Sequence, residues 1–325
     1  MAVRLADRLA VREAGWIIRN GGLVAFPTET VYGLGANVFN PSAVAQIFEV
    51  KERPSFDPLI VHIASLKDLP ILSYSKNKMV CLLAKKFWPG PLTIVLPKRV
   101  VVPDIVTSGL NTVGIRMPDH EIALGLIKAA GCPIAAPSAN KFGHISPTSA
   151  RHVEKQLPTI DCILDGGNSV VGIESTVIAL NESGFKILRH GVITCKEIET
   201  IVPCLGISSG SVEAAASPGM LHSHYSPNKP MYILGQPFPD GFQREAAALI
   251  SFSGKDTEGY KIVEILTENM DLKEYAVNLF AALHRSEESD VEFIVAEPVP
   301  EQGIGLAIMD RLKKAAFKYS GVTNG

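Results

Sequence analysis

The stretch Gly22-Leu-Val-Ala-Phe-Pro-Thr-Glu-Thr-Val-Tyr-Gly-Leu-Gly35 sets the pattern on which the rest of the chain is built. Its apolar run from Leu23 to Phe26 is typical of a buried strand, and Pro27, which has no N–H to donate, ends that strand. Two hydroxyls and a carboxylate follow, then two glycines. Polar groups at a strand end, beside glycines that let backbone approach a ligand, are typical of binding sites in open α/β sheets. The same residues also suit a capped turn that binds nothing, so the neighbouring segments decide between the two.

The composition is that of an ordinary globular protein of 325 residues, with 46% hydrophobic and 20% charged residues. A net charge of −2 predicts no strong direct binding of nucleic acid. The five cysteines are scattered without a C-x-x-C pair, which argues against a zinc module or a disulfide framework and favours the cytoplasm. We expect no signal peptide and no membrane span, because no apolar run approaches the bilayer-spanning length of roughly 18 to 20 residues.

Helical and strand patterns alternate along the chain, and several strands follow one another without a helix between them. This order predicts an α/β protein with a twisted, mixed sheet. The periodicity predicts helices at 6–20, 76–87, 120–130, 148–156, 272–286 and 302–316, and one beginning at Asn40-Pro41. It predicts strands at 23–26, 59–63, 92–96, 113–117, 133–136, 162–165, 175–180, 185–189, 231–234, 247–253, 262–266 and 292–297.

The composition changes to small and polar residues at 205–217. We therefore expect a first domain over 1–204, a linker or lid over 205–230, and a smaller α/β domain over 231–325. The lid is expected to become ordered over the site when ligands bind.

Lys51 and Arg53 lie just past a predicted helix, in a loop that contains two prolines. They are either favourable charges at a helix C-terminus or a phosphate clamp, in which arginine offers a planar fork and lysine a point charge. The rigid loop favours the clamp.

His62 and Arg116 each lie inside a predicted strand. A single strand histidine is usually a satisfied core residue. Arg116 needs a partner, since a buried unpaired charge is prohibitive, so it either pairs with an internal carboxylate or binds an anion such as an α-carboxylate.

Polar groups recur at other strand boundaries, where small hydroxyl and amide groups either cap a helix or read the polar edges of a ligand. They are Ser138, Asn140, Ser146, Ser175 and Arg189. His222 and His224 resemble a metal pair, but no acidic or cysteine ligand lies beside them in sequence, so we predict no metal site. The Walker, G-x-G-x-x-G, G-x-S-x-G and H-E-x-x-H motifs are all missing from the sequence.

Taken together, ten segments in order resemble the threonylcarbamoyl-AMP synthase family in its long form, a YrdC-type domain followed by a smaller, Rossmann-like α/β domain. The segments are AFPTETVYGLGA, KERPSFDPLIVHIA, WPGPLTIVL, VGIRMP, PIAAPSAN, ISPT, GIESTVI, ILRHG, SPGMLHSHYSP and GLAIMDRLKKAA. The resemblance implies an enzyme that makes threonylcarbamoyl-AMP and pyrophosphate from L-threonine, bicarbonate or CO2, and ATP. It also implies a downstream transferase complex that modifies tRNA with the threonylcarbamoyl group.

The resemblance implies two sets of site residues. The threonine pocket would comprise Thr30, His62, Arg116, Ser138 and Ser175. The ATP site would comprise Lys51, Arg53, Asp57, Thr112, Asn140, Ser146, Arg189 and Tyr225, with Lys51 and Arg53 also catalytic and magnesium carried by the nucleotide. The sequence departs from the family pattern at Asp57, where Asn is frequent, and at His190, where Pro is usual.

Other classes of function remain open from the sequence. A YrdC-type module that binds RNA without catalysis is the main alternative, although the chain lacks a basic stripe interleaved with aromatics. A carbamoyl-transfer maturation protein would carry cysteine-rich zinc elements, which this sequence lacks. A third is an ATP-dependent regulator whose second domain binds a separate ligand.

Overall fold

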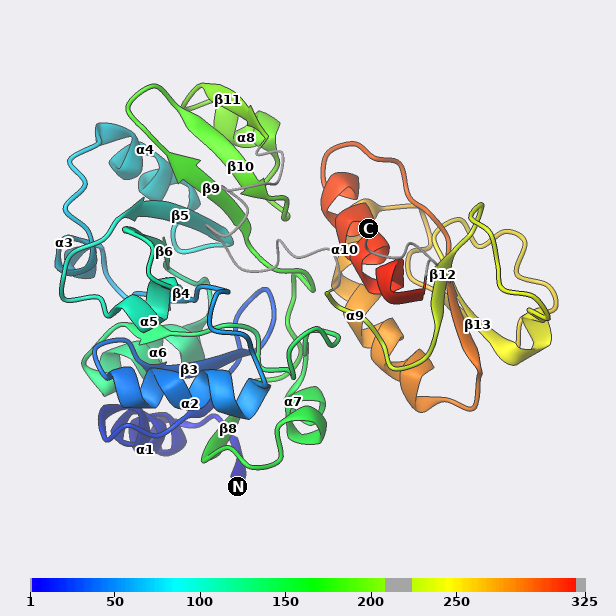
Figure 1. The fold of residues 1–325 in the computed structure, drawn as a ribbon, viewed down its shortest axis with the longest axis horizontal. Helices are drawn as coiled ribbons and strands as arrows, with labels where there is room; N and C mark the ends of the chain where they lie inside the picture. The colour runs from blue at the N-terminus through cyan, green and yellow to red at the C-terminus, as the bar shows by residue number, and fades with distance from the viewer. Residues whose placement is uncertain (1, 208–223, 320–325) are drawn as a thin grey trace.

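A computed structural model of the chain describes residues 2–207 and 224–319. These residues form two α/β units, each built on its own sheet, and helices α9 (Leu272–Glu288) and α10 (Gly305–Ala316) of the second unit lie toward the first (Figure 1). Within these ranges, no helix is both long and apolar enough to cross a bilayer.

The first unit contains a mixed sheet in the order β1-β8-β2-β3-β7-β4-β6-β5-β9-β10-β11. Five pairings are antiparallel (β2–β3, β3–β7, β4–β7, β5–β6 and β9–β10), and the other five, including β4–β6 and β5–β9, are parallel. The predicted mixed sheet is confirmed. Its strands are β1 (Ala2–Leu5), β2 (Val24–Phe26), β3 (Gly33–Asn37), β4 (Ile60–His62), β5 (Leu92–Pro97), β6 (Thr112–Arg116), β7 (Ile134–Ala135), β8 (Cys162–Asp165), β9 (Thr176–Leu180), β10 (Phe185–Arg189) and β11 (Cys204–Ile207).

The helices of this unit begin and end at the signals in the sequence. Asp7 caps the first helix by accepting from Ala10 N, and Asn40 caps the second, which has Pro41 at its first turn. Gly131 ends another in the left-handed conformation at φ 69°. The α-helices are α1 (Arg8–Arg19), α2 (Pro41–Lys51), α3 (Leu69–Leu72), α4 (Lys78–Phe87), α5 (Asp104–Thr107), α6 (Glu121–Ala130), α7 (Ala150–Gln156) and α8 (Cys195–Glu199).

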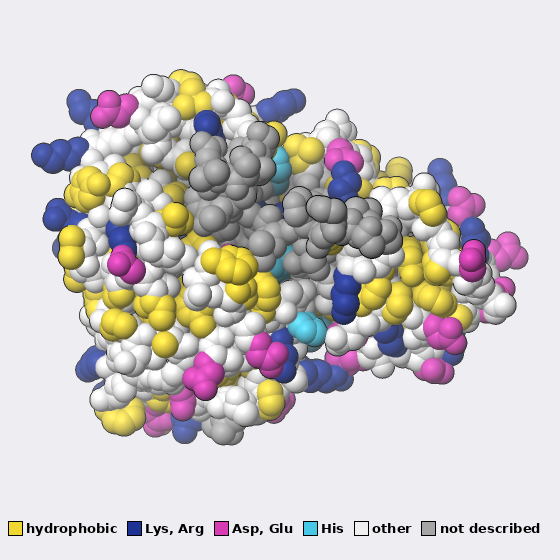
Figure 2. All heavy atoms as spheres, viewed as in Figure 1, with side chains coloured by type: hydrophobic (Ala, Val, Ile, Leu, Met, Phe, Trp, Pro, Cys, Tyr) yellow, Lys and Arg dark blue, Asp and Glu magenta, His cyan; other side chains and the backbone are white. Residues whose placement is uncertain are grey.

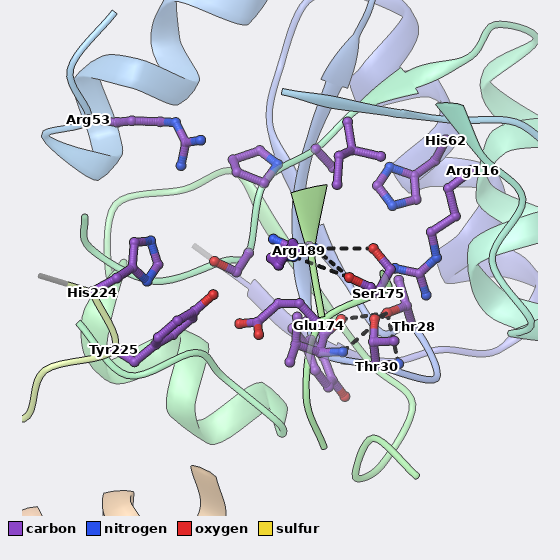
Figure 3. A pocket seen from close by; sticks show the side chains of 17 residues that line it. Thr28, Thr30, Arg53, His62, Arg116, Glu174, Ser175, Arg189, His224 and Tyr225 are labelled. Atoms are coloured by element: carbon purple, nitrogen blue, oxygen red, sulfur yellow. Dashed lines mark hydrogen bonds between the residues drawn. The ribbon is translucent and has the colours of Figure 1, made fainter. Parts of the chain in front are cut away.

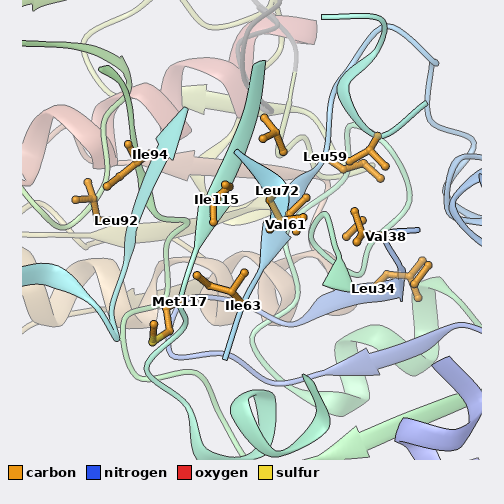
Figure 4. Close-up of a cluster of buried hydrophobic side chains, with 14 of the residues drawn as sticks. Leu34, Val38, Leu59, Val61, Ile63, Leu72, Leu92, Ile94, Ile115 and Met117 are labelled. Carbon is orange, nitrogen blue, oxygen red and sulfur yellow. The ribbon is translucent and has the colours of Figure 1, made fainter. Parts of the chain in front are cut away.

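Side chains alternate between the two faces of the sheet, as the period of two in a strand requires. On β2, Val24 and Phe26 pack with α1 and α6, whereas Ala25 belongs to the cluster on the opposite face. That second cluster collects aliphatic side chains from β3, β4, β5 and β6 in one layer (Figure 4). The large core holds the strand ends rigidly, and this fixes the backbone positions of the polar residues that follow the strands.

The second unit contains a parallel sheet in the order β12-β15-β13-β14, with α9 and α10 packed on it. Its strands are β12 (Met231–Ile233), β13 (Ala247–Ser251), β14 (Ile262–Ile265) and β15 (Phe293–Ala296). Strands alternate with helices over residues 262–316, as expected for parallel pairing, and the prediction of a small second α/β domain is confirmed.

Three strands were not predicted from the sequence. The glycines of Gly33–Asn37 were interpreted as a ligand loop, yet they form β3 between β2 and β7. A Cβ on Gly35 would lie 2.7 Å from Ile134 and 2.8 Å from Phe26, so glycine there makes room for packing. The short edge strands β1 and β11 also escaped prediction, and β11 overlaps the start of the expected linker. Residues 208–223 of that linker lie outside the described residues.

The two units share one hydrophobic cluster. Val31, Ile145 and Ile173 of the first unit pack with side chains of α9 and α10. Gly172 comes so close to α9 that a Cβ there would lie 2.3 Å from the Ala276 carbonyl oxygen. The rings of His152 and His284 also stack across this interface, with centroids 3.8 Å apart.

We predict that Gly172→Ala weakens the packing between the two units. The added Cβ meets backbone of α9, and φ of 78° is unfavourable for alanine, so the stability loss is expected to exceed the cost of φ alone. Gly109→Ala is the matched control, because its φ is 79° and nothing lies within 4 Å of its Cβ. Urea unfolding of both variants measures the difference; equal losses would contradict a close contact at Gly172.

We also predict that the fold loses stability as the pH falls below about 6.5, the ordinary histidine pKa. Burial lowers the pKa of His152 to about 4 and that of His284 to about 3. Between those values and 6.5 the unfolded chain binds more protons, so protonation favours unfolding, by up to about 1.4 kcal/mol per pH unit for one histidine. Urea unfolding at pH 7 and pH 5 should show a smaller loss in His284→Asn than in the unmodified chain; an unchanged loss would exclude His284 as a contributor.

Candidate active site

Thr30 lies in a buried turn that Thr28 holds in place after β2. The Thr28 hydroxyl donates to the Val31 carbonyl oxygen at 2.6 Å and accepts from the N–H groups of Thr30 and Val31. The two threonine hydroxyl oxygens lie 2.8 Å apart. The turn therefore presents the Thr30 hydroxyl in a fixed position at a pocket wall.

His62 and Arg116 lie side by side because of strand register. They are paired residues at the ends of the parallel strands β4 and β6, so both side chains emerge at the same edge of the sheet (Figure 3). Burial and the neighbouring Arg116 lower the pKa of His62 to about 3, so its imidazole is neutral at pH 7. Its Nδ1 has no hydrogen-bond partner among the described residues.

Arg116 has an internal carboxylate beside it and also lines the pocket. Its Nη2 lies 2.6 Å from Glu29 Oε2, and its Nε donates to the Gly90 carbonyl oxygen at 3.3 Å. Among the described residues, neither Glu29 oxygen has a partner with hydrogen-bond geometry. Both alternatives that the sequence left open for Arg116 are therefore compatible with this arrangement.

Ser175 and Arg189 form the centre of the pocket in Figure 3. Arg189 donates through Nε and Nη2 to the Ser175 carbonyl oxygen and through Nη2 to the Ser175 hydroxyl, at 3.0–3.1 Å. The Ser175 hydroxyl also lies 2.8 Å from the hydroxyl of Thr93. These bonds lock the rotamers of both pocket residues.

Arg53 lies at the opposite end of the pocket from His62 and Arg116 (Figure 3). It donates to the Asp57 and Pro58 carbonyl oxygens at 3.1 Å, and its Nη2 lies 2.9 Å from Asp57 Oδ2. Burial lowers the pKa of Arg53 and raises that of Asp57. Asp57 is thus placed behind Arg53 and fixes its position.

Lys51 ties the loop after β7 to the end of α2. Its ammonium group donates to the carbonyl oxygens of Ser138, at 2.7 Å, and Asn140. Burial lowers the pKa of Lys51 well below its usual range. Asn140 is held by bonds from Nδ2 to the Lys141 and His144 carbonyl oxygens, whereas its buried Oδ1 has no partner among the described residues.

Residues 224 and 225 close one side of the pocket from the segment between the two units. Tyr225 is 1% exposed, and its hydroxyl points toward the centre of the pocket without a hydrogen-bond partner in the described residues (Figure 3). Its ring lies 4.1 Å from the ring of His224 and 5.5 Å from that of Phe280 on α9. The free space left in the pocket is about 50 Å³, which holds a few water molecules.

The structure brings most of the predicted site residues into this one pocket. Those that line it are Thr30, Arg53, His62, Arg116, Ser138, Ser175, Arg189 and Tyr225. Lys51, Asp57 and Asn140 support its walls from behind, and Ser146 bonds to the pocket residue Glu174 at 2.5 Å. Thr112 lines a separate small cavity that shares Ile60 with the pocket.

Sequence reasoning did not assign four residues that belong to this site. Glu29 and Glu174 are the buried acids beside Arg116 and Ser146, and His224 is a lining residue. Arg311 reaches the site from α10. The signal for the two acids was available, since each directly precedes a predicted pocket residue in a matched segment, whereas nothing local in the sequence placed Arg311 near them.

The pocket is built for anions. Among the described buried residues, five are cationic (Lys51, Arg53, Arg116, Arg189, Arg311) and three are acidic (Glu29, Asp57, Glu174). Buried cations in excess bind carboxylates and phosphates, and arginine binds both through paired hydrogen bonds. No group of three or more His, Cys, Asp or Glu side chains suited to a metal occurs in the described part of the chain.

Fold and site therefore define a two-domain α/β protein with a buried cationic pocket for small anionic ligands. A family model of the Sua5, YciO and YrdC group, described as Telomere recombination, matches residues 16–191. A second, described as Threonylcarbamoyl-AMP synthase, C-terminal domain, matches residues 193–317. The chain belongs to the threonylcarbamoyl-AMP synthase family.

Relatives with this name match over nearly the whole chain. The threonylcarbamoyl-AMP synthase of Pyrococcus abyssi is 46% identical over 94% of both chains. That of Bacillus subtilis is 42% identical over 94% of this chain and 92% of its own. The crystal structure of P. abyssi Sua5 complexed with L-threonine is 43% identical, with a TM-score of 0.87 over 97% of this chain and 96% of that one.

We predict that Asp57→Ala destabilises the fold far more than Asp57→Asn. Alanine leaves Arg53 buried without its ion-pair partner, which costs about 3–5 kcal/mol, whereas asparagine keeps a polar oxygen at the position of Asp57 Oδ2, 2.9 Å from the Arg53 Nη2. Asp57→Asn also removes one negative charge behind the pocket and should tighten binding of pyrophosphate. Urea unfolding and pyrophosphate calorimetry measure the two effects; equal stabilities, or weaker pyrophosphate binding in Asp57→Asn, would contradict this role for Asp57.

Proposed function

We propose that this protein synthesises threonylcarbamoyl-AMP from L-threonine, bicarbonate or CO2, and ATP, and releases pyrophosphate. The observation that carries this proposal is one pocket with His62 and Arg116 at one end and Arg53 at the other. An amino acid and a nucleotide each bring an anionic group to such a pocket. The relatives named above, and the solved relative described with L-threonine, support the same activity.

The threonine subsite comprises Thr30, His62, Arg116, Ser138 and Ser175 in this proposal. Arg116 has N–H groups beyond those directed at Gly90 and Glu29, and these are suited to the threonine carboxylate. Neutral His62 and the Thr30 hydroxyl are suited to the amine and the side-chain hydroxyl. Selection of threonine over serine requires a site for one methyl group, which is worth roughly 1–3 kcal/mol.

The ATP subsite takes the rest of the proposed residues. Arg53 and Arg189 face the phosphates from the pocket wall, and Tyr225 lies beside them. Directly behind that wall stand Lys51, Asp57, Asn140 and Ser146, whereas Thr112 lines the separate small cavity that shares Ile60 with the pocket. Magnesium enters as part of the MgATP substrate, since the buried carboxylates near the phosphates, Asp57 and Glu174, already pair with arginines.

The reaction needs no enzyme nucleophile. The threonine amine adds to CO2 and loses a proton, and an oxygen of the resulting carbamate attacks the α-phosphorus as pyrophosphate leaves with the P–O bonding electrons. Orienting two bound reactants is worth on the order of 7–11 kcal/mol. Arg53, with Lys51 behind it, stabilises the charge that develops on the departing phosphates, which is their proposed catalytic role.

The domain boundaries expected from the change in composition are also part of the proposal. Residues 1–204 form the catalytic domain, 205–230 the linker, and 231–325 the C-terminal domain. The free space of about 50 Å³ is too small for a nucleotide, so ATP entry requires residues 224 and 225 to move. A lid role for the linker is part of the same proposal, and the positions of His224 and Tyr225 in the pocket wall support it.

Further partners belong to the same proposal. The product is a mixed carbamic–phosphoric anhydride, so a separate transferase must pass the threonylcarbamoyl group to tRNA, in the cytoplasm. The face in Figure 2 shows lysines and arginines interspersed with acidic residues, which does not form a track for nucleic acid.

The test is mass spectrometry of products formed from ATP, L-threonine and ¹³C-labelled bicarbonate. We expect a threonylcarbamoyl-AMP carrying the label and an equal amount of pyrophosphate. Absence of the labelled product, together with saturable binding of tRNA, would instead favour an RNA-binding module without catalysis.

We predict that Arg116→Gln raises the threonine concentration needed for half-maximal rate by about 10- to 100-fold, since a charged hydrogen bond is worth about 1.5–3 kcal/mol. The single change also leaves Glu29 without its ion-pair partner and should lower the melting temperature. The double variant Glu29→Gln/Arg116→Gln removes both charges, so it should recover stability but not threonine use. Normal threonine saturation in either variant would refute the assignment of Arg116.

A further inference from the structure

Arg311 is a buried charge of the C-terminal unit that points into the catalytic unit. It lies on α10 and is 1% exposed. Its Nε lies 3.1 Å from Glu174 Oε2, and its Nη1 donates to the His190 carbonyl oxygen at 2.5 Å. Its guanidinium also lies over the Tyr225 ring, 5.6 Å from the centroid.

These three contacts end on or beside groups of the pocket, whereas the other bonds of Nη1, to the Ala307 carbonyl oxygen and to Asp310 Oδ2, stay within α10. Glu174 and Tyr225 line it, Glu174 directly precedes Ser175, and His190 directly follows Arg189. Glu174 also accepts from the Ser146 hydroxyl through its other oxygen. One side chain of the second unit thus contacts three separate segments of the site, by bonds to Glu174 and the His190 carbonyl oxygen and by its position over the Tyr225 ring.

Tyr225 needs such support because of its backbone. It is held at φ 62°, in the left-handed region that bulky residues avoid. Residues in that region persist only where surrounding structure fixes them. Here the fixing groups are Phe280 on α9, whose ring stacks on Tyr225, and Arg311 on α10.

The cost of burying Arg311 also argues for a role beyond stability. A buried ion pair is often no more stable than an apolar replacement of similar volume, so its presence at the junction of two units is not explained by stability alone. The exposed pair of Arg285 with Glu264, by contrast, links only neighbouring elements of the second unit.

We propose that Arg311 is a positioning residue through which the C-terminal domain sets the nucleotide side of the pocket. It holds Glu174, the turn after Arg189 and the Tyr225 ring in one arrangement. His62 and Arg116 are positioned by strand register and by Gly90 and Glu29, none of which touches Arg311. The division of the pocket into an ATP side and a threonine side rests on the proposed function.

The test compares Arg311→Met and Arg311→Lys with Arg285→Met. Methionine removes the charge and the fork at similar length, lysine keeps the charge without the fork, and Arg285→Met removes an exposed pair of the same domain. Hydrogen exchange followed by mass spectrometry should show faster exchange of peptides over 189–193 and 224–230 in Arg311→Met, including the Ser226 amide that bonds to Gly143. Unchanged exchange there would overturn the proposal whether or not the protein makes threonylcarbamoyl-AMP.

The second readout is the split between the two substrates. Arg311→Met should raise the KM for ATP by about tenfold, and Arg311→Lys by less, while the KM for threonine rises by a smaller factor, because Ser175 of the threonine side adjoins Glu174. Arg285→Met should change neither. Equal rises for both substrates would indicate a merely structural role and overturn the proposal. If Arg311→Met fails to fold, hydrogen exchange and the two KM values are measured on Arg311→Lys and Glu174→Gln instead.

Discussion

The structure depends on the pairing of buried guanidinium groups with carboxylates at one edge of the sheet. Three carboxylates each approach one guanidinium: Glu29 faces Arg116, Asp57 faces Arg53, and Glu174 faces Arg311. The pairs of Glu29 with Arg116 and of Glu174 with Arg311 join segments far apart in the sequence, whereas Arg53 and Asp57 lie in one loop. Burying a charge without a partner costs a prohibitive amount of free energy. The strand ends, the α10 helix and the loop that follows α2 must therefore all lie where they bring these partners together.

The sheet supplies the geometry that this charge requires. Parallel pairing of β4 and β6 puts His62 next to Arg116, and parallel pairing of β5 and β9 brings Thr93 near Ser175. Strands buried on both faces give these side chains rigid supports. Preorganised donors in a site that excludes water are the usual source of charge stabilisation in catalysis. The neutral state of His62 comes from the same burial.

Local sequence signals were sufficient for most elements and for much of the site. Caps at Asp7 and Asn40 and the stop at Gly131 mark helices within a few residues of their ends. Polar residues that follow apolar runs identified the pocket walls. One missed strand, β3, contains glycines with two different roles: Gly33 lines the pocket, but Gly35 makes room for the packing of Phe26 and Ile134. A Cβ clash between strands is a property of the assembled sheet and leaves no local pattern.

The sequence by itself determined which chemical groups are present, the order of helices and strands, and, through ten ordered segments, the family. Tertiary structure decided which of those groups meet. Asp57 stands behind Arg53 and Lys51 bonds to backbone, although both were expected at the nucleotide, and Arg311 joins the site from a separate domain. Spacing along a chain reports neighbours on one element, whereas contacts among distant elements depend on strand order, register and domain packing, which only the folded chain specifies.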